Sequence, residues 1–464
     1  MKQTFIILFT FLTIQLGAKI SPEIYSIVQN IAQYNQLESE NVGISGETTI
    51  QYRNFIKLRD NATIDELLEL LKHENSVVKG YSSWALADRM YPRLVDIFDE
   101  FMVNGYSAKA QNGCIVSNEN LAKELYYRVV NQHFHNKLSV NDSLFFQIQI
   151  QKLDSVILYG SNDGYLVHRV LSTNHSNSKN YDRIRYLAAT NKRDYYLVAL
   201  AEYQNPDDIS FLMQQDRNAF LAISVFPNPK FWNFLLGYSS KEKSLNYFLA
   251  VSSFKNSSAL ELLNELYKSC NSEQINNLDK ALIKNYCKLY QDLILKIWEN
   301  NKTIDYTITQ SLITDCPEKA SLSFSRGLLN DCEFNFLELD SNYGTKGSIL
   351  QLMIENIINY NPSLLNEICI KNIKDSKFME LSTILNVVEQ RQITKATQAI
   401  LERLNKRNYP FEIFQLTETL LSFDNTEANM QLVEILKSKR NDWDKGNWSE
   451  GFRKLFKENN LEIE

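Results

Sequence analysis

The histidines are the first residues of this sequence whose types and spacing could do chemistry. His133 and His135 are separated by one residue, and His168 and His175 follow further along the chain. Imidazole nitrogens bind transition metals and exchange protons near neutral pH. On a strand the first pair would share a face, but on a helix it would diverge by about 200°, and no nearby Asp or Glu spacing completes a site. We interpret these histidines as polar loop or surface residues.

Two other patterns share letters with catalytic motifs without completing them. Residues 76–79, Ser-Val-Val-Lys, have the Ser-x-x-Lys spacing of serine acyl-enzymes, in which the lysine helps to deprotonate the serine. The companion Lys-Thr-Gly motif is absent, and a helix start explains Ser76. Residues 344–348 lack the Walker spacing of a phosphate loop, and no Gly-x-Ser-x-Gly, HExxH or Rossmann fingerprint occurs. The sequence therefore predicts no catalytic, metal-binding or cofactor-binding residues and no cofactor.

The cysteines could form disulfides in an oxidising compartment. The spacings of residues 270 to 287 and 316 to 332 would suit staples between neighbouring antiparallel helices, but many connectivities are possible. Small buried hydrophobic residues are the simpler interpretation. No CxxC or Cys/His spacing indicates zinc. The six cysteines are Cys114, Cys270, Cys287, Cys316, Cys332 and Cys369.

Composition indicates a long helical protein. A chain of 464 residues is too long for one compact core, so several domains or an elongated repeat array is expected. Its 14 Gly and 8 Pro leave few helix breakers. The net charge of −6 and the pI near 5.6 argue against nucleic acid as the main partner, because phosphate binding needs a concentrated basic face. The one dense basic run, residues 437–440, is interpreted as a solvated helix end.

Residues 1–18 have the features of a secretory signal peptide. Lys2 supplies a charged start, residues 5–16 form an apolar stretch, and Gly17 and Ala18 supply a small-residue exit. The stretch is shorter than the roughly 20 residues that cross a bilayer, no second stretch of that length occurs, and no Cys follows it to carry a lipid. We predict a secreted or periplasmic protein without a membrane span. Leu16 is a poor residue two positions before Ala18, which leaves the cleavage site open.

The strongest helical pattern covers residues 63–101. Thr63 and Glu66 form a predicted capping box, in which the hydroxyl and the carboxylate bind free amides at a helix start, and an apolar leucine face follows. A second helix is predicted from Asn75 and Ser76. Its sequence resembles the second helix of a HEAT repeat, in which an acidic or Asn turn precedes Val-Arg, paired small residues and Ala-Leu. The matching positions here are Asn75, Val78, Lys79, Ser82, Ser83, Ala85 and Leu86.

The HEAT resemblance implies an all-α fold, an α-solenoid or superhelix of divergent HEAT-like helical hairpins. Small residues let the helices of such a repeat pack closely. Lys79 stands where the family usually has Arg, and Ser82 and Ser83 replace alanines, which puts the family's acid-to-Arg ladder in doubt. The resemblance is strong near residues 63–101, moderate over 183–265 and faint elsewhere.

A repeated corner organises the second half of the chain. Each copy contains Ala, then an aromatic residue, then Asn, and the Asn is a predicted N-cap with Pro at the first helical position in two copies. The copies are residues 199–206, 222–229 and 250–257, with later echoes at Asn361 and Asn425.

These features predict four segments. They are a signal peptide (1–18), an N-terminal helical region (19–133), an irregular connecting segment (134–180) and a helical-repeat array (181–464) whose carboxy end, with Trp443, Trp448 and Phe452, covers the last apolar face. In the connecting segment, residues 145–151 alternate like a strand, but residues 153–159 have helical spacing, and we favour helix. A polar segment at residues 36–47 is expected to be mobile.

Repeats without catalytic motifs predict an exported protein-interaction scaffold, not an enzyme. We expect a protein or peptide partner on the concave face. The sequence does not identify the partner, the concave-face residues or the oligomeric state, nor does it separate a scaffold from an inhibitor or immunity-type protein. The alternative is an exported enzyme or metal-dependent binder with a histidine pocket near residues 133–168.

Overall fold

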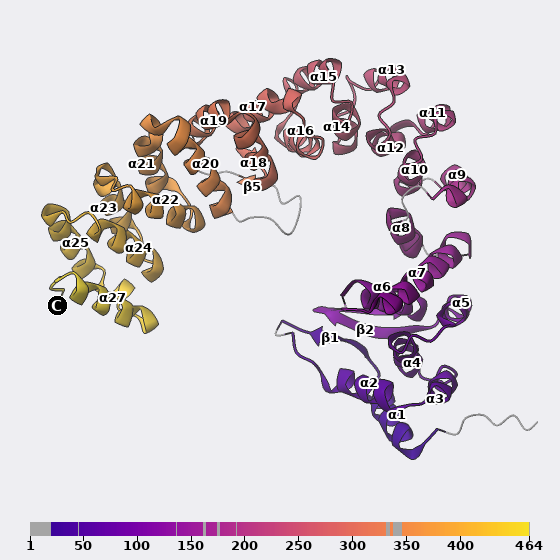
Figure 1. Ribbon diagram of the computed structural model, residues 1–464. Helices are drawn as coiled ribbons and strands as arrows, with labels where there is room; N and C mark the ends of the chain where they lie inside the picture. The colour runs from indigo at the N-terminus through magenta and orange to yellow at the C-terminus, as the bar shows by residue number, and fades with distance from the viewer. Residues whose placement is uncertain are drawn as a thin grey trace, which may run out of the picture. The chain divides into compact units, whose positions relative to one another are not determined.

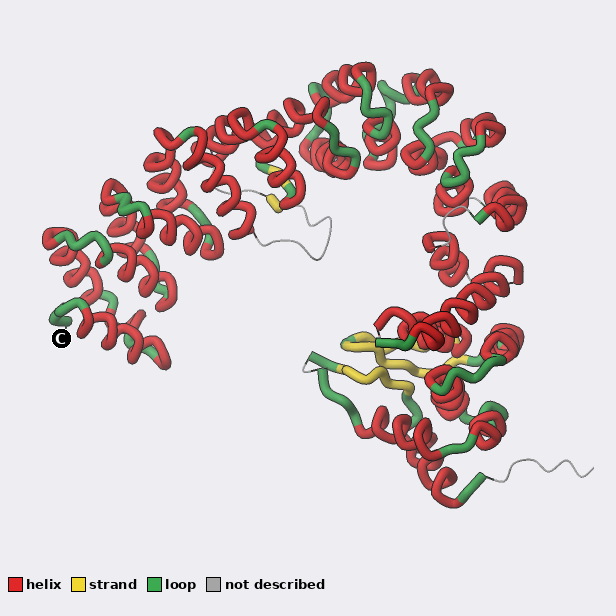
Figure 2. The backbone as a smooth tube through the Cα atoms, viewed as in Figure 1, coloured by secondary structure: helices red, strands yellow, loops and turns green. Residues whose placement is uncertain are grey.

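The computed structural model describes residues 20–44, 46–135, 137–160, 164–173, 177–191, 193–330, 335–336 and 346–463. Over these residues the chain forms 27 α-helices and little sheet, with 75% of the structure helical (Figure 2). The predicted helical class is therefore confirmed. Two compact units, Met1–Thr190 and Asn191–Glu464, share the chain (Figure 1), and each is described by itself. The predicted signal peptide lies outside the described residues. In the described ranges, no helix combines the length and hydropathy that a membrane span requires.

Helices surround a small sheet in the N-terminal unit. The strand order is β1-β2-β3, with β1 parallel to β2 and β2 antiparallel to β3. Helices α2 and α4 pack against β1, and α6 contacts β3. The strands are β1 (Leu37–Val42), β2 (Ser107–Gly113) and β3 (Ile115–Asn120). The helices are α1 (Pro22–Tyr34), α2 (Ile50–Asn61), α3 (Ile64–Leu70), α4 (Ser76–Asp88), α5 (Leu94–Asn104), α6 (Leu121–His135), α7 (Val140–Gly160), α8 (Gly164–Thr173), η1 (Ser178–Asn180) and α9 (Tyr181–Thr190).

The sheet corrects the prediction of a purely helical N-terminal region. Its first strand lies in the segment that was expected to be mobile, and it buries Leu37 and Glu38. The Glu38 carboxylate accepts hydrogen bonds from the Thr49 hydroxyl and from Gln36 Nε2, the latter at 3.0 Å. The strand was hidden in the sequence because four of its six residues are polar and buried Glu38 directly follows buried Leu37, so no apolar alternation marks it.

Two predicted helix starts are confirmed in this unit. The capping box of α3 is complete, since Thr63 Oγ1 accepts from Glu66 N at 3.2 Å and Glu66 Oε2 accepts from Thr63 N at 2.9 Å. Glu66 also accepts from Ser21 N at 2.8 Å. Burial raises the pKa of Glu66, but the hydrogen bonds from Thr63 and Ser21 outweigh it and lower the pKa to about 2. The side chain of Asn75 caps α4.

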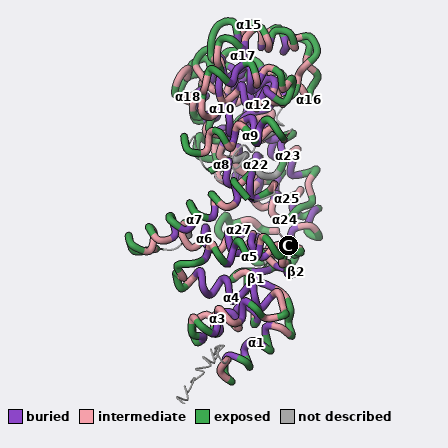
Figure 3. Tube along the Cα trace, turned by 90° about the vertical axis from the view of Figure 1, so that its right-hand side faces the viewer, coloured by how far each residue is buried: buried purple, intermediate pink, exposed green. Residues whose placement is uncertain are grey.

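Helix α4 is the central element of the N-terminal unit, and residues 77–87 are all buried (Figure 3). The hydroxyls of Ser82 and Ser83 donate to carbonyl oxygens of the same helix. Gly80 lets β1 approach, because a Cβ built there would lie 2.3 Å from Leu37 Cδ1. The small residues therefore serve close packing of α4 against its neighbours, as predicted.

Helix α7 covers residues 140–160 of the predicted connecting segment and confirms helix in preference to strand over residues 145–151. Its early turns leave apolar side chains in solvent, with Val140 85% and Leu144 52% exposed (Figure 3). Residues 161–163 and 174–176 of the same segment lie outside the described residues.

The C-terminal unit consists of helices joined by short corners. Its first half contains α10 (Asp194–Ala201), η2 (Pro206–Asp208), α11 (Ile209–Met213), η3 (Asp216–Ala219), α12 (Phe220–Val225), η4 (Pro229–Phe231), α13 (Trp232–Leu236), α14 (Leu245–Ser252), α15 (Ser257–Tyr267), α16 (Ser272–Lys284), η5 (Lys288–Tyr290), α17 (Gln291–Asn301), β4 (Thr303–Ile304) and α18 (Tyr306–Asp315). Its second half contains α19 (Pro317–Asn330), β5 (Asn335–Phe336), α20 (Lys346–Tyr360), η6 (Pro362–Leu364), α21 (Leu365–Asp375), α22 (Phe378–Gln390), η7 (Thr394–Ala396), α23 (Thr397–Lys406), α24 (Pro410–Leu421), α25 (Thr426–Ser438), α26 (Arg440–Trp443) and α27 (Gly446–Glu458).

Alternate helices of this unit pack against one another. One row contains α10, α12, α14 and α16, each in contact with the next, and the same alternation links α18, α20, α22 and α24. Helices α17, α19, α21, α23 and α25 form a second row. Figure 1 shows α11, α13 and α15 beside the first of these rows.

The repeated corners start helices as predicted. Asn205, Asn228 and Asn256 each accept a hydrogen bond from a backbone N–H of the following helical segment, and Pro residues occupy the first helical position after the first two. Asn425 caps α25 in the same way. The echo at Asn361 is different, because its side chain makes no cap bond and donates to Ser325 Oγ at 3.3 Å.

The residue before the capping Asn has a role that the sequence did not reveal. Gln204, Lys255 and Asp424 have left-handed backbones, with φ of 51°, 49° and 48°. A left-handed residue ends one helix and turns the chain sharply before the next. Pro227 stands at this position in the second copy and cannot adopt a positive φ, so that copy reaches its Asn through an extended residue, Phe226, with φ −124° and ψ 72°.

Aromatic residues pack together at the carboxy end. Trp443 and Phe452 are buried and 5.2 Å apart, and Trp448 packs at 5.7 Å on Phe414 of α24. The basic run at residues 437–440 is exposed except for Lys439, whose Nζ donates to Asn408 Oδ1 at 2.9 Å.

The described cysteines are free thiols, so the 270–287 staple is not formed. Cys332 lies outside the described residues. Cys114 is exposed at the tip of the β2–β3 hairpin, and Cys369 is buried in α21. Burial raises the pKa of the Cys369 thiol to about 12.

Candidate functional site

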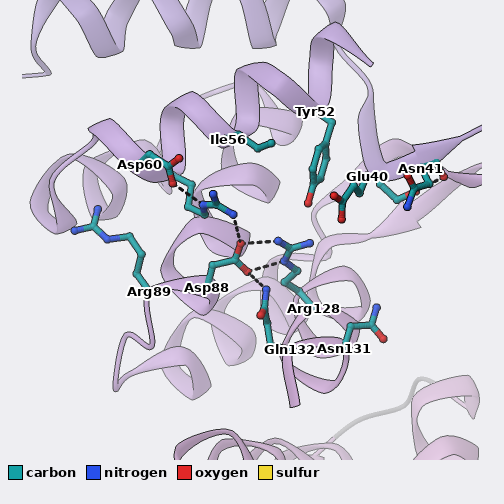
Figure 4. Close-up of a pocket in the computed structure, with 12 residues that line it drawn as sticks. Glu40, Asn41, Tyr52, Ile56, Asp60, Asp88, Arg89, Arg128, Asn131 and Gln132 are labelled. Carbon is teal, nitrogen blue, oxygen red and sulfur yellow. Dashed lines mark hydrogen bonds and ion pairs between the residues drawn. The ribbon is translucent and has the colours of Figure 1, made fainter. Parts of the chain in front are cut away.

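A polar cleft of about 950 Å³ opens in the N-terminal unit beside the end of β1 (Figure 4). Its walls come from residues 39–41 of β1, one side of α2, the end of α4 and the last turns of α6. All of these elements belong to the N-terminal unit, so the cleft needs no other part of the chain. Its charged lining residues are Arg59, Arg89, Arg128, Glu40, Asp60 and Asp88.

Asp88, the last residue of α4, lies at the centre of the cleft. Its Oδ1 accepts from Arg128 Nε at 2.7 Å and its Oδ2 from Arg128 Nη2 at 2.5 Å, a two-pronged ion pair. Gln132 Nε2 donates to Oδ1 at 2.5 Å, and Arg59 Nη1 lies 3.6 Å from Oδ2. Two guanidinium groups therefore share one carboxylate whose side chain is only 6% exposed.

The Arg128 guanidinium is held in one orientation. It lies 5.2 Å from the ring centroid of Phe55 and 5.3 Å from that of Trp84. Burial lowers the pKa of Arg128, but the hydrogen bonds and charge of Asp88 outweigh it and raise the pKa above its usual value. Asp88 occupies two nitrogens of the guanidinium, and Figure 4 shows the third turned toward Tyr52 and Glu40. The Arg128 guanidinium is therefore charged, stacked on two rings and fixed by Asp88 and Tyr52.

Two further arginines border the same end of the cleft. Arg59 Nε donates to Asp60 Oδ1 at 2.7 Å, a bond that raises the pKa of Arg59, and its guanidinium lies 6.0 Å from the Phe55 ring. Arg89 is exposed, and its Nη1 donates to the Ala62 carbonyl oxygen at the end of α2. Among the described residues Arg89 forms no ion pair.

The opposite end of the cleft is acidic. Figure 4 shows Glu40 and Asn41 beside the Tyr52 hydroxyl, away from Arg89 and Asp60. Glu40 is exposed and forms no ion pair with any residue that the structure describes. The charges of three arginines and three acids cancel over the whole lining. The end of the cleft away from Glu40 holds three arginines and two acids, an excess of one positive charge. The cleft is therefore polarised from Arg89 to Glu40.

A second candidate surface lies on α10, α12 and α14 of the C-terminal unit. Neighbours in the row flank α12 on two sides, so its free side carries the partly exposed Leu221, Ser224 and Val225. The corresponding side chains of α10 are Tyr195 and Val198. Helices α12 and α14 contain no charged residue. This face can bind a partner through apolar and hydrogen-bonding contacts.

The structure places the histidines apart from both surfaces. His133 lies on α6, with its ring 4.8 Å from that of Phe134 and its Nδ1 buried without a hydrogen-bond partner in the described structure. His168 is exposed on α8. The His135 side chain and His175 lie outside the described residues. Over the described ranges, no group of three or more His, Cys, Asp or Glu side chains could hold a metal ion.

The Ser-x-x-Lys pair of α4 has structural roles. Ser76 begins the helix after its cap, and Lys79 Nζ donates to the Leu71 carbonyl oxygen at 2.8 Å and lies 4.3 Å from the Tyr106 ring. Burial lowers the pKa of Lys79. Residues 344 and 345 of the glycine-containing segment lie outside the described residues, and α20 begins at Lys346.

No protein-family model matches this chain, and neither the curated proteins nor the solved structures contain a match. The cleft and the face of α10, α12 and α14 therefore stand on their own geometry.

Sequence reasoning missed the cleft because its members come from separate helices. Arg59, Asp88 and Arg128 each look like an isolated surface charge in the sequence. A weak signal existed, since Asp88 and Arg128 both lie next to strongly apolar helical stretches, where an unpaired charge would be costly. Only the packing of α2, α4 and α6 shows that they meet.

Proposed function

We propose that this protein is an exported binding scaffold without catalytic activity. Its C-terminal unit is an α-solenoid of HEAT-like hairpins that holds a protein or peptide on its concave face. Residues 1–18 support export, and the small buried residues of α4 support the HEAT-like assignment.

The observation that carries the proposal is unequal packing along the two sides of the array. Helices α10, α12, α14 and α16 touch directly, whereas α11 reaches α13 through the short segment η4 and α15 contacts η5. A stack whose helices are close on one side and spaced on the other must curve toward the close side. The α10–α16 row therefore lines the concave face.

The chemistry of this face favours an uncharged segment of a partner. Helices α12 and α14 bring no charge, and their partly exposed residues include Leu221, Ser224 and Asn246. Side chains of this kind form the apolar centre of protein interfaces, where charged residues are depleted. The alternative, a histidine pocket near residues 133–168, receives no support of this kind from the packing.

Arginine substitutions on the two sides of the array test the proposal. Ser224→Arg with Asn246→Arg adds bulk and charge to the concave face, whereas Ser210→Arg with Asn233→Arg makes the same changes on α11 and α13. We expect the first pair to abolish saturable binding of a partner captured from the exported fraction and the second pair to preserve it. Equal loss in both pairs, or no saturable partner, would contradict the proposal.

A further inference from the structure

We propose that the cleft of the N-terminal unit binds the carboxyl terminus of a short peptide, with the terminal carboxylate at Arg59 and Arg89 and the peptide N–H groups toward Glu40. This site is separate from the concave face and does not depend on the function proposed for it.

The arginine end of the cleft has donors that the protein leaves for a ligand. Asp88 takes two nitrogens of Arg128 and the third is turned toward Tyr52 and Glu40, so Arg128 contributes its charge to this end and the free donors belong to Arg59 and Arg89. Arg59 uses its Nε for Asp60, while its Nη1 stands at 3.6 Å from Asp88. Arg89 uses one nitrogen for a carbonyl oxygen. Guanidinium forks bind planar carboxylates through paired N–H bonds, which makes an oxyanion the natural occupant.

The net charge of the arginine end favours a carboxylate over a phosphate dianion as the ligand. The arginine end holds three positive groups against Asp60 and Asp88, an excess of one. One carboxylate neutralises that excess, whereas a phosphate dianion would leave a net negative charge in a recess with Asp88 at its centre. Asp88 is 6% exposed, so solvent does little to screen the repulsion.

The other end of the cleft favours a peptide over a simple organic acid. Glu40 accepts hydrogen bonds but donates none when ionised, so it fits N–H groups that follow the carboxylate. Ser39, Glu40 and Asn41 belong to β1, which is an edge strand because it pairs only with β2 in the described sheet. A peptide backbone lying beside this strand end matches its polar groups. The volume of about 950 Å³ accommodates several residues.

The lining gives little basis for side-chain selection. Ile56 and Tyr52 are its main apolar members, and the rest is polar or charged. We therefore expect recognition of the carboxylate and the backbone, with weak preference among small side chains.

Isothermal titration of the full-length protein with matched peptides tests the inference. The probes are acetyl-tetra-alanine as the free acid, the same peptide as its carboxamide, inorganic phosphate and glucuronate. We expect saturable binding of the free acid and at least about tenfold weaker binding of the carboxamide, because charge-assisted bonds to the terminus are lost. Phosphate and glucuronate should each bind more weakly than the peptide acid.

Three single variants locate the binding. Arg59→Gln and Arg89→Gln should each weaken binding of the free-acid peptide by about fivefold or more. The circular dichroism spectrum should stay unchanged, because both side chains reach solvent. Arg53→Gln, an exposed arginine of α2 outside the cleft, removes the same charge and should leave the affinity within about twofold. Carboxamide binding as tight as the acid, tighter binding of phosphate or glucuronate, no saturation by the acid, or equal loss in Arg53→Gln would each overturn the inference.

Discussion

Replacing Gly327 by alanine should destabilise the C-terminal unit, although the same change stabilises an ordinary helix. Gly327 lies inside α19, where Gly→Ala normally gains about 0.5–1 kcal/mol. A Cβ at this position would lie 2.4 Å from Trp298 Nε1, 2.6 Å from Cε2 and 2.9 Å from Cζ2. Carbon contacts prefer about 3.5–4.0 Å, so the indole must move by about 1 Å.

The indole of Trp298 has no room for this movement. It is fully buried, its Nε1 donates to the Ser323 carbonyl oxygen at 3.1 Å, and its ring meets Phe324 edge-on at 6.1 Å. Overpacking a core costs about 1–3 kcal/mol, and a buried N–H without an acceptor costs about 1–3 kcal/mol more. After the helix gain is subtracted, Gly327→Ala should lose about 1–5 kcal/mol.

Hydrogen exchange measured by mass spectrometry reads this loss locally, in peptides from α17 to α19, and avoids assuming two-state unfolding of the whole chain. Gly451→Ala is the matched control, because its Cβ would meet only Phe414 Cε2 at an ordinary 3.5 Å. In a Trp298→Leu background, Gly327→Ala should become neutral or stabilising, which gives a coupling energy of about 1–5 kcal/mol. An unchanged exchange rate in Gly327→Ala, or the same loss in both backgrounds, would refute the reasoning.

Three other predictions concern buried charge and thiols. Glu412→Ala should lower local stability by about 3–5 kcal/mol, as measured by hydrogen exchange in α21–α24. The substitution leaves the guanidinium of Arg403, which is 2% exposed and bonded to Glu412 Oε1 at 2.6 Å, without its carboxylate. Asp292→Ala is the control, because it breaks an exposed pair with Lys319 and should change stability little. Burial raises the pKa of Glu124 from its ordinary 4.5 to about 7, so the folded protein binds the proton more tightly and loses stability as pH rises from about 4.5 to 7. Glu124→Gln should remove this pH dependence, so its melting temperature relative to the wild type should be higher at pH 8 than at pH 4. An unchanged pH dependence of stability would contradict the assignment. In iodoacetamide labelling followed by peptide mapping, exposed Cys114 should react first and Cys369 last, because burial blocks access and holds its pKa near 12; early loss of the Cys369 thiol would show that α21 opens readily.

Local rules predicted the parts of the fold that depend on neighbours in sequence. The Thr63 and Glu66 box and the Asn205, Asn228 and Asn256 caps are formed because each needs only a side chain and an amide two or three residues away. The echo at Asn361 shows the limit of this reasoning, because its side chain forms a hydrogen bond with a serine on another helix and does not cap its own.

The sheet and the cleft depend on contacts between distant segments. β1 pairs with β2 although residues 43–106, which include α2, α3, α4 and α5, separate them. Buried Glu38 binds Thr49 through its carboxylate and Tyr81 of α4 through its backbone N–H, and Asp88 binds side chains from α2 and α6. A polar sequence gives no sign of such burial, because the same residues would be equally suitable for a solvated loop.

Basic side chains near helix ends bear on the predicted resemblance to HEAT repeats, because they bind backbone carbonyl oxygens. Among the described residues, five of them donate to carbonyl oxygens in the last turn or C-cap of a helix, where no intrahelical partner exists and the helix dipole is negative. The pairs are Lys79 with Leu71, Arg89 with Ala62, Arg183 with Leu158 and Tyr159, Lys302 with Gly327, and Arg403 with Ile373 and Ser376. Lys79 is the residue whose departure from Arg put the acid-to-Arg ladder in doubt. Because its ammonium group binds a carbonyl oxygen, this helix pair is fixed without an acidic partner. The acids of the N-terminal unit are then available for other contacts, and Asp88 makes them with Arg59 and Arg128 in the cleft.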